Sequence, residues 1–476
     1  MEPLVDLPLL LPPADSRRRL AALHRALQAA IGDGRLQPGL RLPATRRLAA
    51  ALGLSRNTVL AAYDLLLSEG YVEARRGSGT YVGRIARQPR AASGGGLSRR
   101  LAPAWRARRP LAEPAPGGAY AFDLRLGSPE QALFPHALWR RLSNRAGRAL
   151  ARSPAAYGGP EGRAGLRAAI ARHVSFTRAV ACTVDDIVVT AGAQQAFDLL
   201  ARILVTPGKT LVAVEDPGYP PLRAAFAAAG AALAPVPVDG EGLVVERLPR
   251  RARVVCVTPS HQFPLGVVLS PARRAQLIDW ARSRDAVLVE DDYDSEFRYG
   301  GRALDALQTL DRDGRVVYVG TFSKCLFPVL RLGYVVAPPW ARPALLAARQ
   351  ASDWHGDPLP QDTLASFIDE GHLARHLRRM RRLYDARRSL LLQGLSRLAW
   401  LQPLPSAAGL HLAARLHGRL SGTVLARRAA EAGIAVEALE RYAVRQPAAW
   451  CGLAFGFGTI AAERIEAAIA GLARLG

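Results

Sequence analysis

The sequence predicts a small N-terminal winged helix-turn-helix domain, of α+β class, followed by a large C-terminal α/β domain with a mostly parallel sheet. The length of 476 residues exceeds one ordinary hydrophobic core, which favours two or more domains. Apolar residues at helical spacing and then two short β-type runs occupy residues 16–83. Beyond residue 120, apolar strand-like runs alternate with helical patterns, which is typical of parallel sheets covered on both faces.

Three helices and a hairpin are expected in the N-terminal domain. Apolar residues recur at helical spacing over 16–31, a shorter helix follows within 44–53, and a third begins after Ser55, a suitable N-cap. The apolar face of the third helix consists of Val59, Tyr63, Leu66 and Leu67. The segment YVEARRGSGTYVG at 71–83 then supplies two short strands joined by a turn. This order of elements predicts the winged helix-turn-helix.

The polar residues of this domain suit DNA chemistry. Arg56, Asn57 and Thr58 fall in the first turn of the third helix, which reaches base edges and phosphates in such motifs. Arg46 and Arg47 on the second helix are placed to contact the DNA backbone. The hairpin turn adds Arg75, Arg76, Gly77 and Gly79. The alternative interpretation is an ordinary three-helix domain with solvated arginines.

Charge and cysteine usage restrict the partners and the compartment. The net charge is +24, and the first 110 residues hold 19 arginines against 7 acidic residues, or +12. This asymmetry indicates a polyanionic partner for the N-terminal part, although an arginine-rich genome would also raise the total. The four cysteines lie far apart without CxxC pairs, and no apolar stretch is long enough to span a bilayer. We therefore expect a cytoplasmic protein.

Composition also sets the expected domain boundaries. Residues 85–119 are rich in Gly, Pro, Ser and Arg and keep no periodicity, which is typical of a flexible cationic linker. We therefore expect a DNA-binding domain over 14–84, the linker over 85–119 and an effector domain over 120–476.

Five strand-like runs of the large domain end in polar residues. Ligands of open α/β sheets bind beyond the carboxyl ends of strands. This rule brings Ala193, Gln194, Tyr219, His261, Gln262, Asp291, Tyr293 and Lys324 towards one crevice. Only Lys209 and Lys324 are lysines, and the other 62 of the 64 basic residues are arginine. Because arginine cannot lose its proton, a lysine retained in a polar loop suggests an amine that must become neutral. Lys209, in the turn-like TPGKT, is expected to be solvated.

The crevice residues suit pyridoxal 5′-phosphate (PLP). Lys324 can form an imine with an aldehyde, Asp291 can keep a pyridine nitrogen protonated, and Tyr293 can hydrogen-bond a ring hydroxyl. Thr321, Arg331 and the backbone amides of Ala193 and Gln194 can hold a phosphate. Each element alone has a plain alternative: a solvated lysine, a helix cap at Asp291, or a structural ion pair at Arg331.

The N-terminal domain resembles the GntR-type winged helix over nearly its whole length. The matching pieces are PG-x-RLP-x-x-R, LA-x-x-LG-x-SRNTV, and EG-Y followed by G-S-G-T. The resemblance implies binding to double-stranded operator DNA. The positions that contact the operator in the family are occupied here by Arg46, Ser55, Arg56, Thr58 and Gly77.

From about residue 120, the chain resembles fold-type I PLP-dependent proteins of the aspartate aminotransferase superfamily. The blocks TPSHQFPLG, EDDYDSEFRY, GTFSKCLFPVLRLGY and GHLARHLRRMRRLYDARR resemble the MocR/GabR subfamily of GntR regulators. The resemblance implies that Lys324 is the Schiff-base lysine, that Asp291 pairs with the pyridine nitrogen, and that Tyr293 lies near the phenolic oxygen. It also implies that Tyr219 stacks on the ring, and that His261 or Gln262 lies beside it.

The remaining implied roles concern the phosphate and the quaternary structure. Ala193, Gln194, Thr321 and Arg331 are implied to hold the phosphate. Tyr157 of YGGPEG is implied to reach the phosphate of the neighbouring subunit's cofactor, so the site implies a homodimer.

Two departures from simple aminotransferases bear on function. SHQFPLG replaces an NPTG-like segment, and WCGLAFGFG has no arginine where those enzymes grip the substrate carboxylate; Arg441 is our substitute candidate. The resemblance favours a regulator that senses an amine-bearing effector through external aldimine formation. The alternatives are a working aminotransferase with a DNA-binding appendage and a nonspecific cationic DNA-binding protein. The effector's identity stays open.

Overall fold

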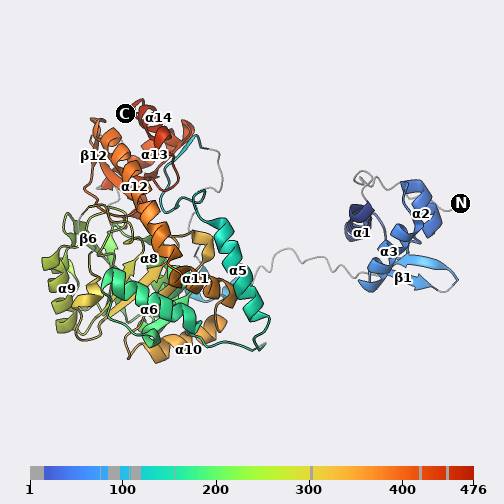
Figure 1. Ribbon diagram of the computed structural model, residues 1–476, viewed down its shortest axis with the longest axis horizontal. Helices are drawn as coiled ribbons and strands as arrows, with labels where there is room; N and C mark the ends of the chain where they lie inside the picture. The colour runs from blue at the N-terminus through green and yellow to red at the C-terminus, as the bar shows by residue number, and fades with distance from the viewer. Residues whose placement is uncertain are drawn as a thin grey trace. The chain divides into compact units, whose positions relative to one another are not determined.

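The computed structural model describes residues 16–75, 77–83, 97–106, 108, 120–154, 156–300, 304–417, 421–445 and 450–475. The chain divides into two compact units, Met1–Leu101 and Ala102–Gly476 (Figure 1). Each unit has hydrophobic cores of its own. None of the described helices combines the length and apolar composition needed to cross a bilayer.

The small unit is a three-helix domain with a β-hairpin, as the sequence predicts. Its elements are α1 (Ser16–Gly32), α2 (Thr45–Leu52), α3 (Arg56–Ser68), β1 (Val72–Arg75) and β2 (Gly79–Val82). The two strands pair antiparallel. Gly77 has φ +73° in the turn that joins them, a conformation that favours glycine. Val59, Tyr63 and Leu66 are buried in the core, but Leu67 is 43% exposed, so its predicted place in the apolar face was wrong. Leu67 lies about 100° around the helix from Leu66, on the side that faces away from the core.

Short helical turns stand in the segment predicted as an irregular linker. They are η1 (Leu97–Arg100) and α4 (Pro103–Arg106). Most of 85–119 lies outside the described residues, as does Arg76 of the hairpin turn.

The large unit contains an eight-stranded sheet whose order is β4-β11-β10-β9-β8-β5-β6-β7. Its strands are β4 (Ile187–Thr190), β5 (Leu211–Asp216), β6 (Ala232–Asp239), β7 (Gly242–Leu243), β8 (Val254–Val257), β9 (Val287–Asp292), β10 (Val316–Thr321) and β11 (Gly333–Val336). The central pairs from β10 to β6 are parallel, and β11 runs antiparallel to both of its neighbours. The predicted mostly parallel sheet is confirmed, and β11 is an addition to it.

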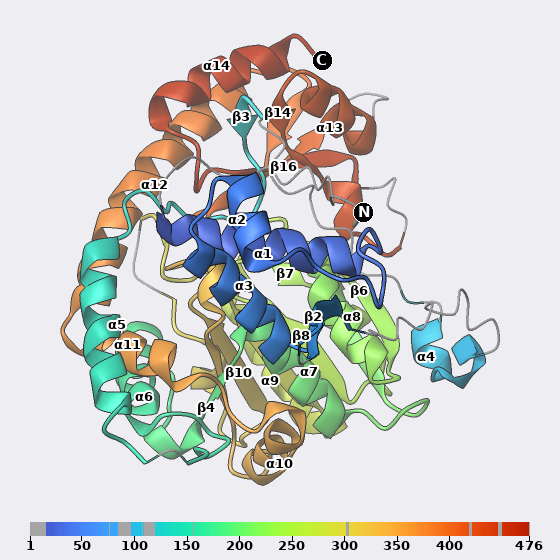
Figure 2. The same cartoon turned by 90° about the vertical axis from the view of Figure 1, so that its right-hand side faces the viewer.

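Helices cover both faces of this sheet. The helices α7 (Gly192–Leu204), α8 (Pro220–Ala228) and α10 (Arg342–Asp353) pack on one face, and α9 (Pro271–Arg284) packs on the other. Residues of β10 alternate accordingly: Val317 and Val319 join the core with α7, whereas Val316 joins the core with α9. Figure 2 shows β8 and β10 at the centre of the large unit.

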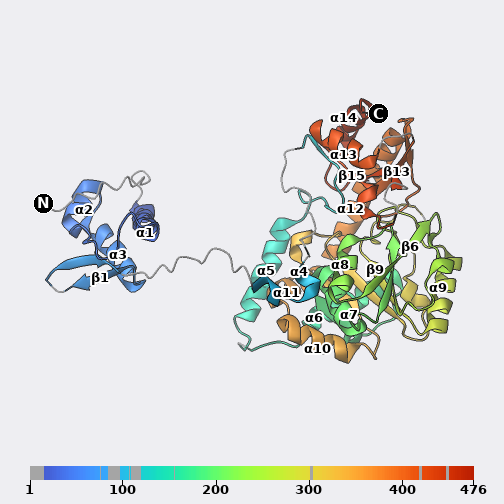
Figure 3. The same cartoon turned by 180° about the vertical axis from the view of Figure 1, so that it is seen from behind.

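The remaining helices and a second sheet complete the large unit. The helices are α5 (His136–Leu150), α6 (Ala164–Arg178), α11 (Pro358–Asp369), α12 (His372–Ser396), α13 (Gly422–Glu431) and α14 (Ala462–Ala473). The four-stranded sheet contains β12 (Leu401–Pro403), β13 (His411–Leu416), β16 (Gly452–Gly456) and β15 (Glu437–Ala438). The strands β3 (Phe122–Asp123) and β14 (Ile434–Ala435) pair with each other. The single-turn helices are η2 (Val184–Asp186), η3 (Val245–Arg247), η4 (Leu307–Leu310), η5 (Pro328–Leu330) and η6 (Leu439–Tyr442). Figure 3 shows α13, α14 and β13 gathered at one end of this unit, which α12 joins to the rest.

Candidate cofactor and DNA-binding sites

One edge of the large sheet collects the predicted site residues. The strands β4, β9 and β10 run in the same direction, and their registers bring Thr190, Asp292 and Thr321 to this edge. Because β11 runs the opposite way, it begins at this edge, which places the preceding Arg331 there as well. The unpredicted antiparallel strand therefore explains how a basic residue in a loop reaches the carboxyl ends of the parallel strands.

A cavity of about 230 Å³ lies at this edge. Eight residues predicted from the sequence line it: Ala193, Gln194, Tyr219, Asp291, Tyr293, Thr321, Lys324 and Arg331. Seven further lining residues were not predicted: Gly127, Phe263, Asp294, Ser323, Pro328, Leu410 and His411. Asp294, Ser323 and Phe263 stand within three residues of predicted positions, so motif adjacency was a usable signal. Gly127, Leu410 and His411 come from distant segments, which the sequence alone did not link to the strands.

Lys324 has a specific neighbour at the cavity wall. Its Nζ donates a hydrogen bond to the carbonyl oxygen of Gly127 at 2.8 Å. A Cβ on Gly127 would lie 2.5 Å from that Nζ, so a side chain there would displace the lysine amine. Burial lowers the pKa of the Lys324 amine, which favours its neutral, nucleophilic form. Lys209 is exposed in the turn between α7 and β5, as predicted.

Asp291 presents an unsatisfied acceptor to the cavity. Its side chain is 3% exposed, and Oδ1 has no hydrogen-bond partner among the described residues. Burial, and after it the nearby Asp292 and Glu215, raise the pKa of this carboxyl well above its usual range. A buried polar atom without a partner is costly, so the position suits a ligand that brings a cationic N–H. A protonated pyridine nitrogen has that chemistry.

The opposite end of the cavity suits an anion. Ala193 and Gln194 lie in the first turn of α7, where backbone N–H groups are free of intrahelical partners. Arg331 donates from Nη2 to the Ala191 carbonyl at 2.8 Å, which holds its guanidinium beside this helix start. Gly192 has φ +74°, and a Cβ there would lie 3.1 Å from Arg331 Nη1. The glycine therefore lets a cation approach the helix start closely, as a phosphate site requires.

The SHQFP segment is arranged differently from our expectation. Phe263 lines the cavity, and its ring meets Tyr219 edge-on at 5.3 Å. His261 and Gln262 are both buried behind the wall. Gln262 donates to the Pro217 carbonyl at 2.8 Å and accepts from the Leu265 amide, so it fixes the loop. This placement corrects the expected position of either residue beside the ring.

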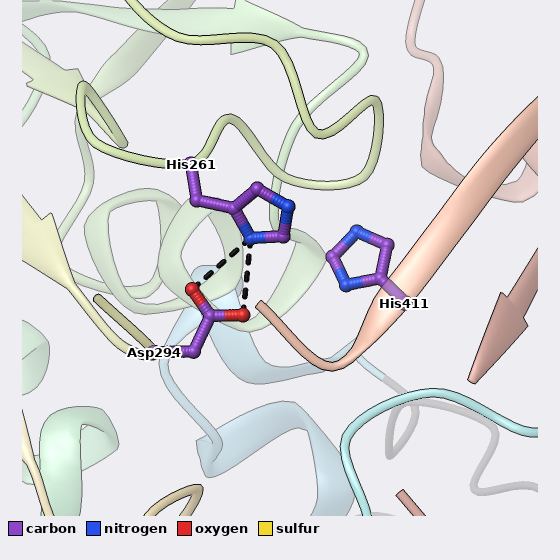
Figure 4. A group of neighbouring side chains, drawn as sticks. All are labelled: His261, Asp294 and His411. Atoms are coloured by element: carbon purple, nitrogen blue, oxygen red, sulfur yellow. Dashed lines mark hydrogen bonds and ion pairs between the residues drawn. The ribbon is translucent and has the colours of Figure 1, made fainter. Parts of the chain in front are cut away.

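His261 contacts the cavity through the lining residues Tyr293 and Asp294. Its Nδ1 lies 3.0 Å from the Tyr293 hydroxyl and 3.0 Å from both oxygens of Asp294. Figure 4 shows His261 and Asp294 together with His411. The His411 and His261 ring centroids are 4.7 Å apart.

Two further predicted residues lie outside the cavity walls. Tyr157 is 78% exposed and stacks on Trp354 at 5.0 Å between ring centroids. Arg441, in η6, has Nη1 3.8 Å from Glu437 Oε2. The Asp216 carboxylate accepts from the amides of Val444 and Arg445, which ties the segment after η6 to the end of β5. Arg441, the candidate for holding an anionic effector, thus has the acidic neighbour Glu437.

The predicted DNA-binding residues gather at the start of α3, on α2 and at the hairpin turn. The Ser55 hydroxyl accepts from the Thr58 amide at 3.1 Å, which makes Ser55 the N-cap of α3. Arg46, Arg56 and Gly77 are exposed. The surface of the small unit therefore presents the cationic side chains and hydrogen-bond donors that DNA binding requires.

Comparison with known proteins agrees with both units. The family described as "Bacterial regulatory proteins, gntR family" matches residues 21–82, and "Aminotransferase class I and II" matches residues 124–450. The probable rhizopine catabolism regulatory protein MocR of Rhizobium meliloti is 40% identical over 433 residues, which cover 89% of this chain and 87% of that protein. The pyridoxine biosynthesis transcriptional regulator PdxR of Corynebacterium glutamicum is 36% identical, with 96% and 95% covered. The chain belongs to the MocR/GabR subfamily of GntR-type transcriptional regulators.

The large unit of this MocR-type regulator has the fold of an enzyme. The solved kynurenine aminotransferase of Pyrococcus horikoshii superposes with a TM-score of 0.73 at 26% identity, covering 80% of this chain and 98% of that one. The fold is therefore that of fold-type I aminotransferases, whose cofactor is PLP. The regulators of this subfamily bind operator DNA and respond to effectors.

Proposed function

We propose that this chain is a PLP-dependent transcriptional regulator that binds operator DNA through its small unit and senses an amine-bearing small molecule at Lys324. The observation that carries the proposal is the cavity at the sheet edge. It combines one part-buried lysine, one buried carboxyl oxygen without a partner among the described residues, and a cationic helix start.

Different residues contact different parts of the cofactor. Asp291 receives the protonated ring nitrogen, Tyr293 the ring oxygen, and Tyr219 lies against the ring. Arg331, Thr321 and the first turn of α7, at Ala193 and Gln194, hold the phosphate. Phe263 takes the place beside the ring that the sequence suggested for His261 or Gln262.

The lysine supplies the reactive amine. When bound, PLP supplies an aldehyde that forms a carbon–nitrogen double bond with an amine. Lys324 is the chain's own amine for that bond, and burial keeps part of it neutral. An effector amine competes with it for the same carbon. This exchange alters DNA affinity only to the extent that the two conformations of the regulator bind the effector unequally.

The small unit carries the DNA contacts. Arg56 and Thr58 at the start of α3 face the major groove, Ser55 and Arg46 contact phosphates, and Gly77 lets the hairpin turn approach the backbone. The work of such a regulator places it in the cytoplasm. The effector is an amine or an amino-acid-like compound.

A homodimer is part of the same proposal. Tyr157 is an exposed aromatic residue on the large unit, and its neighbour Trp354 is 45% exposed. An exposed aromatic pair suits an interface better than solvent. We place this pair at the contact between two copies, with Tyr157 against the phosphate of the partner subunit's cofactor.

Transamination is the second candidate function. The cavity contains the lysine, the acid and the tyrosine that such chemistry needs. However, Phe457 is fully buried in the segment where simple aminotransferases carry a substrate-binding arginine. Multiple turnover with an amino donor and a keto acid would favour the enzyme, whereas effector-dependent operator binding without turnover favours the sensor.

The test is the variant Lys324→Ala. After addition of PLP and borohydride, we expect wild-type chain and a Lys209→Ala control to carry covalent cofactor, and Lys324→Ala to carry none. Basal affinity for a DNA fragment selected by the wild-type chain should stay within about twofold, because Lys324 lies in the other unit from α3. Covalent cofactor on the Lys324→Ala chain would contradict the assignment, and so would its absence from the wild type.

A further inference from the structure

His261, Asp294 and His411 form a buried cluster that the roles above do not use. Ligand atoms of all three lie within 4.8 Å of one another (Figure 4). Their side-chain types suit a metal, but the ring nitrogens already have protein partners. His411 Nε2 faces the Pro264 carbonyl at 3.0 Å, and His261 Nε2 faces Ser406 Oγ at 3.2 Å. We therefore interpret the cluster as a hydrogen-bond network.

The partners of His261 determine where its hydrogens lie. Ser406 Oγ donates its only hydrogen to the Ala408 carbonyl at 3.1 Å, so towards His261 it can only accept, and Nε2 must carry a hydrogen. Nδ1 faces both oxygens of Asp294 at 3.0 Å. A carboxylate only accepts, so Nδ1 also carries a hydrogen. The pair is then an imidazolium ring against a carboxylate, and each buried charge has the hydrogen-bonded partner that burial requires.

This arrangement fixes the direction of the Tyr293 hydroxyl. Tyr293 Oη lies 3.0 Å from the same Nδ1. That nitrogen has one hydrogen, which Asp294 accepts, and no lone pair to receive another, so the phenol's own hydrogen must point elsewhere. Tyr293 lines the cavity, which is the open direction. Burial, and after it the charge of Asp294, raise the pKa of this phenol well above its usual range, so the hydroxyl keeps its hydrogen.

We propose that Asp294 and His261 are positioning residues, which turn the Tyr293 hydroxyl hydrogen into the cavity and thereby set how strongly it donates to the cofactor's ring oxygen. The inference deepens the proposed function and rests on PLP occupying this cavity. It gives His261, which does not contact the cofactor, a role in orienting a residue that does.

The surrounding backbone is shaped to the imidazole ring. Gly409 has φ +76°, and a Cβ there would lie 2.0 Å from His261 Cε1 and 2.4 Å from Asp294 Oδ2. Gly266 has φ +77°, and its Cβ would lie 3.2 Å from His261 Nε2. Only glycine fits at either position, so the backbone of Gly409 and Gly266 packs closely against two sides of the His261 ring.

Among the described residues, the other ionisable groups around the network include Asp291 and Lys324 of the cavity, His411 of β13, and also Glu215, Asp292 and Tyr299. Burial, followed by the adjacent His261, lowers the pKa of His411 well below its usual range. His411 therefore favours its neutral form.

The network should be visible in the pH dependence of the cofactor's absorbance. A hydroxyl that donates to the ring oxygen favours the anionic form of that oxygen and lowers the pH at which the spectrum changes. Tyr293→Phe should raise this midpoint by about one pH unit. His261→Gln, whose amide can replace only Nε2, should raise it in the same direction. His261→Asn, whose amide can replace Nδ1, should return it towards the wild-type value.

A double variant separates positioning from general damage. His261→Gln should add nothing in the Tyr293→Phe background, because the hydroxyl it positions is already absent. A full additional shift there, or equal shifts in the Gln and Asn variants, would overturn the proposal. A His173→Phe control on α6 should leave the midpoint unchanged.

A second measurement does not depend on the cofactor. Nitrogen NMR of the histidine rings in the cofactor-free wild-type chain should show both nitrogens of His261 bonded to hydrogen at neutral pH, with His261→Gln identifying the signals. A ring nitrogen without hydrogen would overturn the inference even if PLP binds as proposed. Conversely, failure of PLP to bind, with both hydrogens present, would reject only the proposed function.

Discussion

Several carboxyl groups near the cavity are buried. Glu215 on β5 is one whose burial has an effect on stability that an experiment can measure. Its Oε2 accepts from the Thr258 hydroxyl at 2.5 Å and from the Thr258 amide at 3.2 Å. Burial nevertheless raises the pKa of this carboxyl from 4.5 to about 7, because the hydrogen bonds offset only part of the desolvation. The stability of the large unit therefore depends on whether Glu215 holds a proton.

The first prediction concerns the pH dependence of stability. Since the folded-state pKa lies above the unfolded one, the contribution of Glu215 is fully present below about pH 4.5 and is lost as pH rises through about 7. Glu215→Gln cannot lose a proton, so it should become more stable than the wild type by about 2–3 kcal/mol above this range. Urea unfolding of both chains from pH 4.5 to 8 measures the difference. The exposed control Glu241→Gln should follow the wild type, and parallel curves for Glu215→Gln would contradict the prediction.

At the scale of single residues, chemistry was easier to predict than position. The scarcity of lysine left two candidates, Lys209 and Lys324. Only Lys324 stands in a motif at the end of a strand, and it lines the cavity. Within SHQFP, the resemblance left the position beside the ring open between His261 and Gln262, whereas Phe263 is the residue that lines the cavity. The loop instead turns Gln262 inward to its own backbone and leaves Phe263 at the wall. Such a choice depends on the path of the loop, which local sequence does not specify.

At the scale of elements, the start of α3 serves both stability and DNA binding. Ser55 Oγ accepts from the Thr58 amide at 3.1 Å and lies 2.8 Å from Thr58 Oγ1. The same turn carries exposed Arg56. A helix start has a positive dipole end, which stabilises a cap oxygen and attracts phosphate alike. A change of charge at Ser55 can therefore separate its role in capping the helix from its role in DNA binding.

The second prediction uses that separation. Ser55→Asp should keep the thermal stability of the chain, because aspartate is as good an N-cap as serine, whereas Ser55→Ala should cost about 1 kcal/mol. Binding to a selected operator fragment at fixed salt should fall at least tenfold for Ser55→Asp, because the new negative charge faces phosphates. Retained operator affinity in Ser55→Asp would remove Ser55 from the DNA-binding surface.

Elements with strong periodicity were predicted correctly, and those without it were missed. The runs that became β5, β8, β9 and β10 are continuous and apolar, so buried parallel strands were the natural prediction. The strand β11 (Gly333–Val336) was missed because only the single-turn helix η5 separates its four residues from the lysine loop. Its antiparallel pairing with β10 is a long-range choice, which the apolar pattern does not encode.

At the scale of the whole molecule, two units with separate cores share one chain. The small unit has the donors and cations for DNA, and the large unit has the cavity. The sequence predicted this division from its change of pattern after residue 83. The resemblance assigned Tyr157 to the neighbouring subunit's cofactor, but the exposure of its side chain becomes visible only when the surrounding loops are folded. A residue that is 78% exposed and stacked on a half-exposed tryptophan raises the question of which subunit it serves.

The third prediction answers that question with mixed dimers of Tyr157→Ala and Lys324→Ala chains, purified through two different tags. If Tyr157 acts across the interface, the site on the Tyr157→Ala chain keeps its own lysine and receives the partner's intact tyrosine. One site per mixed dimer then binds PLP with wild-type affinity, although neither homodimer has such a site. If Tyr157 acts within its own subunit, each site carries one defect. Borohydride fixation at a PLP concentration too low to load the Tyr157→Ala homodimer distinguishes the two, and no fixation in the mixed dimer would rule out the shared site.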